Sequence, residues 1–200
     1  MDPRWAGELG WVLLAWTVVY IADYASTLVT AGLYFKGAQE HIVFEGSMEL
    51  TPAFQSDVDR LRWVSPRFLF SWVASSVALG AIRWLSVDFL GWIQPMQFVV
   101  GALLLREGAI LLRHARNLLL YLRARRTQEM EGRLCYQRSL MLYLSGGELF
   151  SFAAFYAILS LILSSWFLAG GAVACAVTGW QHVRMSRRAR RPAPAEDQAG

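Results

Sequence analysis

The chain has 200 residues, of which 56% are apolar and 17% are charged, with a formal net charge of +4. Soluble domains carry about 25% charged residues, so the composition argues against an ordinary soluble enzyme and indicates a polytopic membrane protein. The two cysteines, Cys135 and Cys175, form no paired-cysteine metal motif and imply no disulfide.

The first apolar stretch, from Trp11 to Tyr34, is long enough to cross a bilayer, which takes about 20 helical residues. Asp23 is its only charged residue. A charge at the bilayer centre costs roughly 2.5–3.5 kcal/mol on insertion scales, so it is seldom kept without a partner or a function. Ser26, Thr27 and Thr30 follow on the same face. These hydroxyls either extend a polar site or bond their own backbone.

The connection 36–67 contains one candidate metal site. If the segment were helical, His41, Glu45 and Glu49 would share one face and offer nitrogen and oxygen ligands to a divalent metal. Gly46 interrupts this pattern, and the run 42–44 suits a strand or loop equally well. A divalent metal is therefore the weaker expectation for this segment.

The same connection also predicts a short helix. Thr51 and Pro52 form a good helix start. Phe54, Val58 and Leu61 then recur at helical spacing. We expect an interfacial helix near 52–64 that leads into the second crossing.

The second crossing is expected from Phe68 to about Trp84, and the third from Trp92 to Leu112, interrupted by Arg106 and Glu107. Beyond it, leucines share one face while basic residues lie off that face, so the third helix should continue into the cytoplasmic interface. The residues expected there to meet anionic lipid headgroups are Arg113, His114, Arg116 and Arg123.

The run from Ser139 to Trp180 holds 42 residues and one charge, Glu148. As one helix it would be about 63 Å long at ~1.5 Å per residue, which is too long for one crossing. We divide it near Ser164. The second half carries rows of small residues, for example Gly170 and Gly171, that allow close packing either within the chain or between subunits.

Arginine sets the orientation, because eighteen of the nineteen basic residues are arginines gathered mainly at 113–138 and 184–191. The positive-inside rule places both clusters in the cytoplasm, and we interpret them as membrane-flanking charge, with no nucleic-acid partner. The fold prediction is an all-α bundle with five crossings, an outside N-terminus and the 36–67 connection inside. If that connection lies outside, the count changes, and four crossings are the alternative.

One transmembrane domain, 1–184, is expected, followed by a basic and then Pro/Ala-rich disordered cytoplasmic tail, 185–200. We place the protein in a bacterial or archaeal cytoplasmic membrane. In this topology Asp23, Arg106 and Glu148 fall about 13–18 Å inside the bilayer, near one plane. Either they form an ion-pair network that fixes helix packing, or they mark a polar site.

Three functions remain open. The favoured one is a small homo-oligomeric channel or transporter, because one arginine among three carboxylates leaves room for a cation or proton. Its pathway residues would be Asp23, Ser26, Thr27, Arg106, Glu107 and Glu148. The second is a membrane-embedded enzyme that acts on a lipid or isoprenoid phosphate held by Arg113, His114 and Arg116. The third is a non-catalytic accessory subunit. We favour a non-enzymatic function, and no P-loop, nucleophile elbow or zinc-protease motif is present in the sequence.

Overall fold

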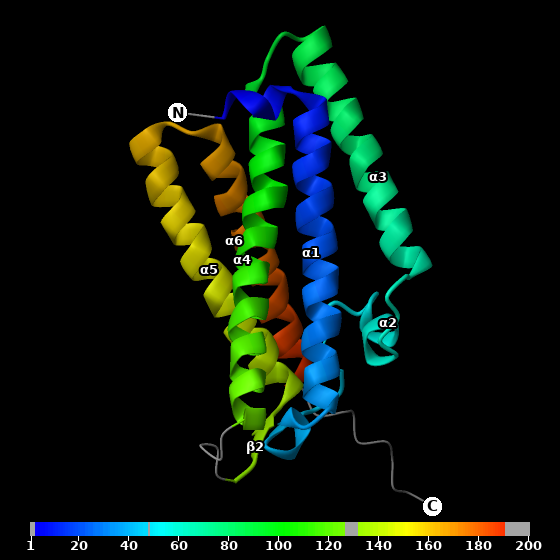
Figure 1. The fold of residues 1–200 in the computed structure, drawn as a ribbon. Coiled ribbons are helices and arrows are strands. Elements are labelled where there is room, and N and C mark those ends of the chain that lie inside the picture. Colours follow the sequence, from blue (N-terminus) through cyan, green and yellow to red (C-terminus); the bar gives the residue numbers. More distant parts are fainter. Residues whose placement is uncertain (1–2, 48, 127–131, 191–200) are drawn as a thin grey trace, which may run out of the picture.

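The computed structural model describes residues 3–47, 49–126 and 132–190, and it confirms the all-α class with about 80% helix. The chain runs up and down between two ends, which we name upper and lower after their positions in Figure 1. Short 3-10 turns cover Arg4–Gly7 and Ala38–Glu40, and a π-helical segment, Trp84–Phe89, extends α3. The helices are α1 (Leu9–Phe35), α2 (Gln55–Asp59), α3 (Pro66–Arg83), α4 (Gln94–Arg126), α5 (Arg138–Leu163) and α6 (Trp166–Ala189).

Within the part of the chain that the structure describes, four helical segments are long and apolar enough to cross a membrane: Leu9–Phe35, Pro66–Phe89, Gln94–Arg123 and Arg138–Leu163. Their outward faces expose large apolar side chains, as a lipid-facing surface requires; Leu161, for example, is 82% exposed. α6 has 24 residues but is not among these segments, and its lower half carries polar side chains.

The predicted division of the long apolar run is confirmed. α5 ends at Leu163, and Ser164 adopts the left-handed conformation with φ 49°. Ser165 then caps α6 by accepting a hydrogen bond from the backbone N–H of Leu168. The chain therefore reverses direction at the upper end (Figure 1).

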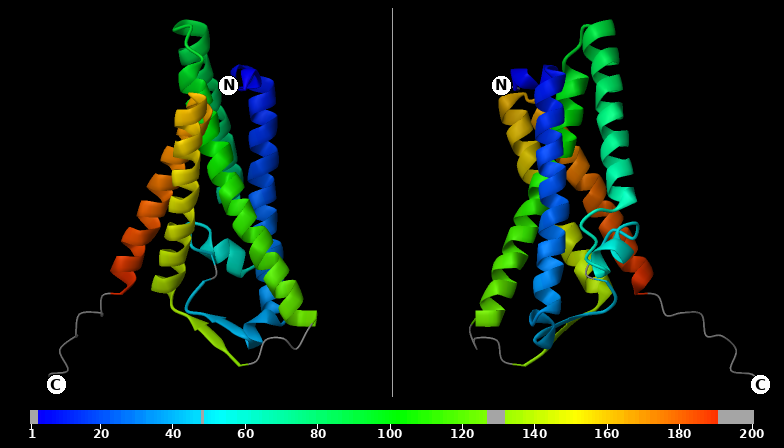
Figure 2. Two further views of the ribbon diagram at one scale, coloured as in Figure 1. Left: turned by 90° about the vertical axis from the view of Figure 1, so that its left-hand side faces the viewer. Right: turned by 45° about the vertical axis from the view of Figure 1, so that its right-hand side comes forward.

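Two short strands, which the sequence analysis did not predict as a sheet, join distant connections. β1 (Ile42–Phe44) pairs in parallel with β2 (Leu134–Tyr136), and Val43 lies opposite Cys135. The pairing holds the α1–α3 and α4–α5 connections at the same lower end, where α6 also finishes (Figures 1 and 2). This agrees with the predicted topology, in which both connections share one side.

Glycines allow α6 to touch both of its neighbours. A Cβ added at Gly170 would lie 1.8 Å from the carbonyl oxygen of Phe98 on α4, and one added at Gly146 on α5 would lie 2.9 Å from the carbonyl oxygen of Gly179. Real Cβ atoms do not approach so closely, so these backbones are in direct contact. The small-residue rows on α6 thus serve packing within the chain.

α3 lies against α1 through polar and aromatic contacts. Trp16 donates its indole N–H to Ser75 Oγ at 2.9 Å, and Trp72 donates to Thr17 Oγ1 at 3.0 Å. Near the lower end Phe68 stacks on Tyr24 with 4.5 Å between ring centroids. Above Trp16 the helices enclose an apolar core that consists of Ala6, Val12, Trp16, Leu79, Met96 and Val100.

The helix predicted near 52–64 is shorter than expected. α2 has five residues, and Thr51 and Pro52 precede it without capping it. Val58 is buried against α1. The segment is therefore held by packing inside the protein, whereas a regular helix lying on the membrane surface was expected.

At the other end of the chain, α6 continues to Ala189, past the predicted tail start at 185, while 191–200 lie outside the described residues.

Candidate functional site

A pocket of about 1130 Å³ lies in the lower half of the bundle. α1 and α4 form one side, and α5 and α6 diverge from α4 toward the lower end (Figure 2). Residues of β1, β2 and the segment 49–58 also line the pocket. All four of the predicted intramembrane charges line it: Asp23, Arg106, Glu107 and Glu148.

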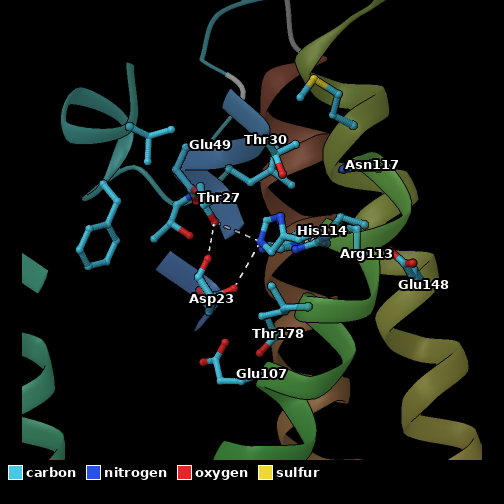
Figure 3. Close-up of a pocket in the computed structure, with 18 of the residues that line it drawn as sticks. Asp23, Thr27, Thr30, Glu49, Glu107, Arg113, His114, Asn117, Glu148 and Thr178 are labelled. Atoms are coloured by element: carbon cyan, nitrogen blue, oxygen red, sulfur yellow. Dashed lines mark hydrogen bonds and ion pairs between the residues drawn. The ribbon is translucent and has the colours of Figure 1, made fainter. Parts of the chain in front are cut away.

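Asp23 and His114 meet across the α1–α4 interface. The Oδ1 atom of Asp23 lies 3.3 Å from Nε2 of His114, and Thr27 Oγ1 lies 3.2 Å from the same nitrogen (Figure 3). The two side chains of the acid–histidine pair are 27% and 15% exposed. His114 therefore belongs to this polar cluster and is the carboxylate's partner, a position that Arg106 was expected to fill.

The hydroxyls after Asp23 bond mainly to their own helix. Ser26 and Thr27 donate to the carbonyl oxygen of Asp23 at 2.9 and 3.0 Å, and Thr30 donates to that of Ser26 at 2.6 Å. Thr27 and Thr30 also line the pocket, whereas Ser26 is not among its lining residues. The polar face that was predicted is therefore limited to Thr27 and Thr30.

The ion-pair network that would join Asp23, Arg106 and Glu148, one of the two interpretations of these charges, is not found among the described residues. Arg106 pairs with its neighbour Glu107, and Glu148 pairs with Arg116 at 3.1 Å between Nη1 and Oε1. The depths calculated from helix positions had placed the three residues at one level in the bilayer. The depth of a residue along its helix does not determine which side chains it contacts. Glu107 and Glu148 each have their own arginine, and Asp23 has His114 as its neighbour.

Arg113 occupies a different position from the paired arginines. Its Nη1 donates to Ser145 Oγ on α5, and that oxygen lies 2.8 Å from Nδ1 of His182 on α6. Ser145 and His182 are 4% and 9% exposed. His182, to which the sequence gave no role, thus lies inside the pocket with Arg113. The signal that could have found it is the close α5–α6 packing implied by the small-residue rows.

Three of the four predicted headgroup residues line the pocket, namely Arg113, His114 and Arg116, and Arg123 does not. Figure 3 shows Arg113 and His114 side by side on α4, with Asp23 across from them. The basic group predicted for a lipid surface is therefore partly enclosed within the bundle.

The helix required by the candidate metal site is absent, because the residues after His41 form β1. Glu45 accepts a hydrogen bond from the backbone of Arg138 at 3.4 Å, and Glu49 accepts one from Thr51 at 2.6 Å. Across residues 3–47, 49–126 and 132–190, no three His, Cys, Asp or Glu side chains are grouped to hold a metal. The prediction that His41, Glu45 and Glu49 share one face of a helix is wrong.

The fold and pocket define an all-α chain with four helices capable of spanning a membrane and a polar site buried among them. In comparisons with known proteins, no family, no curated protein and no solved structure matches this chain. Its function is therefore argued from the site alone.

Proposed function

We propose that the chain is an integral membrane protein that binds, inside its helical bundle, an amphiphile with a phosphate-type anionic headgroup. The observation that carries this proposal is the composition of the pocket. Aromatic side chains of α1 and α3, such as Trp16, Tyr20 and Phe68, line the pocket together with arginines of α4 and α6. An apolar tail and an anionic head need these two surfaces in one continuous cavity.

The charge balance of the pocket supports an anionic ligand. Among the described lining residues are five arginines (106, 113, 116, 184 and 188) and four carboxylates (Asp23, Glu49, Glu107 and Glu148). Three of these carboxylates already have a cationic partner or a histidine. The sequence argument for a cation pathway counted one arginine against three carboxylates, but among the residues that line the pocket arginines outnumber carboxylates. Arginine matches phosphate oxygens in a forked geometry, so the surplus cations favour a phosphate group.

The size of the pocket supports a ligand larger than an ion. Small-molecule sites usually measure about 300–1,000 Å³, and this pocket reaches about 1130 Å³. Along α4 its lining extends from Leu103 to Tyr121, which is about 27 Å at ~1.5 Å per residue. A lipid-sized chain fits that length, whereas a bare ion needs little of it.

For the topology, we propose that α6 is a fifth crossing and that the lower end faces the cytoplasm. At ~1.5 Å per residue, α6, with its 24 residues, is about 36 Å long, and it is packed along both α4 and α5. Arg184, Arg187 and Arg188 lie near its lower end, as the positive-inside rule requires of a cytoplasmic end.

The binding proposal is tested with dodecyl phosphate added to the protein in a neutral maltoside detergent. We expect thermal stabilisation by dodecyl phosphate and none by dodecanol. Ile110→Trp, which fills the pocket, should remove the effect, while Leu112→Trp on the same helix should keep it, because Leu112 is 60% exposed and does not line the pocket. Equal responses of wild type and Ile110→Trp would contradict the proposal.

A second candidate, proton or cation transport by a homo-oligomer, is supported by Glu107, which is 5% exposed at mid-bundle. The apolar core above Trp16 closes the single bundle at its upper half, so a pathway would need a subunit interface. Asp23→Asn should abolish flux in liposomes if this proposal holds, and unchanged flux would exclude it. Light scattering in detergent gives the oligomeric state.

The remaining alternative is a non-catalytic accessory subunit. If the double variant Asp23→Asn and Glu148→Gln keeps both ligand binding and ion flux at the level of the wild type, that result would favour an accessory subunit.

A further inference from the structure

The guanidinium of Arg113 on α4 lies among side chains of α5 and α6. It donates a hydrogen bond to Ser145 on α5, and no carboxylate of residues 3–47, 49–126 and 132–190 lies within salt-bridge distance of it. A guanidinium has five N–H donors. The hydrogen bond to Ser145 uses one of them, and the side chain of Arg113 lines the pocket.

The neighbouring basic side chains of α4 differ from Arg113 in this respect. Arg116 is paired with Glu148, and His114 lies beside Asp23. Burying a charge without a counter-charge is costly, and such groups are normally paired. An anion in the pocket would supply the missing partner.

Two neutral hydrogen-bonding groups lie beside the guanidinium. The Ser145 hydroxyl accepts from Arg113 and is 2.8 Å from His182 Nδ1. The close contact between Gly146 and Gly179 brings α5 and α6 together next to them, one residue from Ser145 and three residues from His182. The cluster thus consists of a cation, a hydroxyl and an imidazole, contributed by three separate helices.

We propose that Arg113, Ser145 and His182 form the seat for the oxygens of a phosphate monoester, with the ester's apolar chain extending toward the aromatic side chains of α1 and α3 that line the pocket. The inference rests on the proposed function, since it names the headgroup site of the same ligand. A monoester carries a charge of about −1.5 to −2 near pH 7. The Ser145–His182 hydrogen bond uses the proton of one of these two groups, so the other can donate to a phosphate oxygen. The planar fork of the arginine can meet two further oxygens at once.

The experiment measures binding of dodecyl phosphate by isothermal titration in the neutral detergent. Arg113→Gln should weaken binding about tenfold or more, as expected for loss of a charged hydrogen bond. Arg184→Gln removes the same charge from the same pocket and should change the dissociation constant far less. Arg113→Lys keeps the charge but not the fork, and it should fall between wild type and Arg113→Gln.

Ser145→Ala provides a variant with a smaller risk of misfolding and should also weaken binding. Unliganded melting temperatures identify any variant that has lost its fold. Inorganic phosphate is titrated separately: binding comparable to dodecyl phosphate would show that the seat takes free phosphate and would overturn the esterified ligand. If wild type and Leu112→Trp bind but Arg113→Gln and Ser145→Ala bind equally well, the seat is wrong while the proposed function stands. Absence of binding to wild type would contradict both.

Discussion

Oδ1 of Asp23 on α1 and Nε2 of His114 on α4 lie 3.3 Å apart, and Thr27 Oγ1 meets the same nitrogen at 3.2 Å. The contact joins the first apolar helix to the central one. It also gives a carboxylate that lies deep in the chain's first candidate span a basic neighbour within ion-pair distance.

The Asp23–His114 contact should be measurable as a coupling energy. In a double-mutant cycle of Asp23→Asn and His114→Gln, followed by unfolding in detergent, we expect about 1 kcal/mol of coupling, because the pair is half-buried. The cycle of Asp23→Asn with Arg116→Gln should be additive within about 0.5 kcal/mol, since Arg116 pairs with Glu148. Additivity in the first cycle would contradict the contact.

Gly170→Ala should destabilise the bundle. The new methyl would lie 1.8 Å from the Phe98 carbonyl oxygen, so α4 and α6 must separate, at a cost of about 1–3 kcal/mol or more. The matched control is Gly147→Ala, which has no heavy atom within 4 Å of its added Cβ. Melting temperatures of the two variants in detergent measure the difference, and equal stability would show that the α4–α6 contact is looser than described.

The parallel strand pair can be trapped with one substitution. Val43 is the register partner of Cys135, and neighbouring strands are about 4.7–4.9 Å apart, within the range that a disulfide spans. Val43→Cys should therefore form a disulfide with Cys135 under mild oxidation, seen as a mobility shift that a reductant reverses. Ile42→Cys is the control, because one residue along a strand faces the opposite side. Cross-linking at both positions alike would argue against this register.

Cysteine labelling tests the fifth crossing. In a Cys135→Ser background, Ser47→Cys and Arg190→Cys should react with an impermeant maleimide from one side of the membrane, and Phe89→Cys from the other. Ser47 and Arg190 lie at the lower end, and Phe89, which is 70% exposed, lies at the upper end. Labelling of Arg190→Cys together with Phe89→Cys would mean that α6 does not cross.

The sequence allowed the site to be located but not its contacts. Asp23 and Glu148 are conspicuous because each is a lone charge in an apolar run. Helical periodicity assigns each of them to one face of its helix, but it does not show which neighbouring helix packs against that face. Arg106 was expected beside Asp23 because their depths agree, yet its own neighbour Glu107 is its partner.

The parts that sequence reasoning missed depend on tertiary contact. His182 becomes part of the pocket because Gly146 and Gly179 let α5 and α6 approach closely. β1 and β2 have three residues each, too few for a recognisable alternation, and each is stabilised by the other. The break at Ser164, by contrast, followed from length alone and is confirmed.

The parallel pairing of Ile42–Phe44 with Leu134–Tyr136 also sets an order of events during synthesis. β1 leaves the ribosome soon after α1, but its partner emerges only after α3 and α4 are complete. Until then Phe44 lacks its aromatic neighbour Tyr136, whose ring centroid lies 5.8 Å away in the finished protein. Both residues line the pocket, so the lower wall of the pocket is completed late in synthesis.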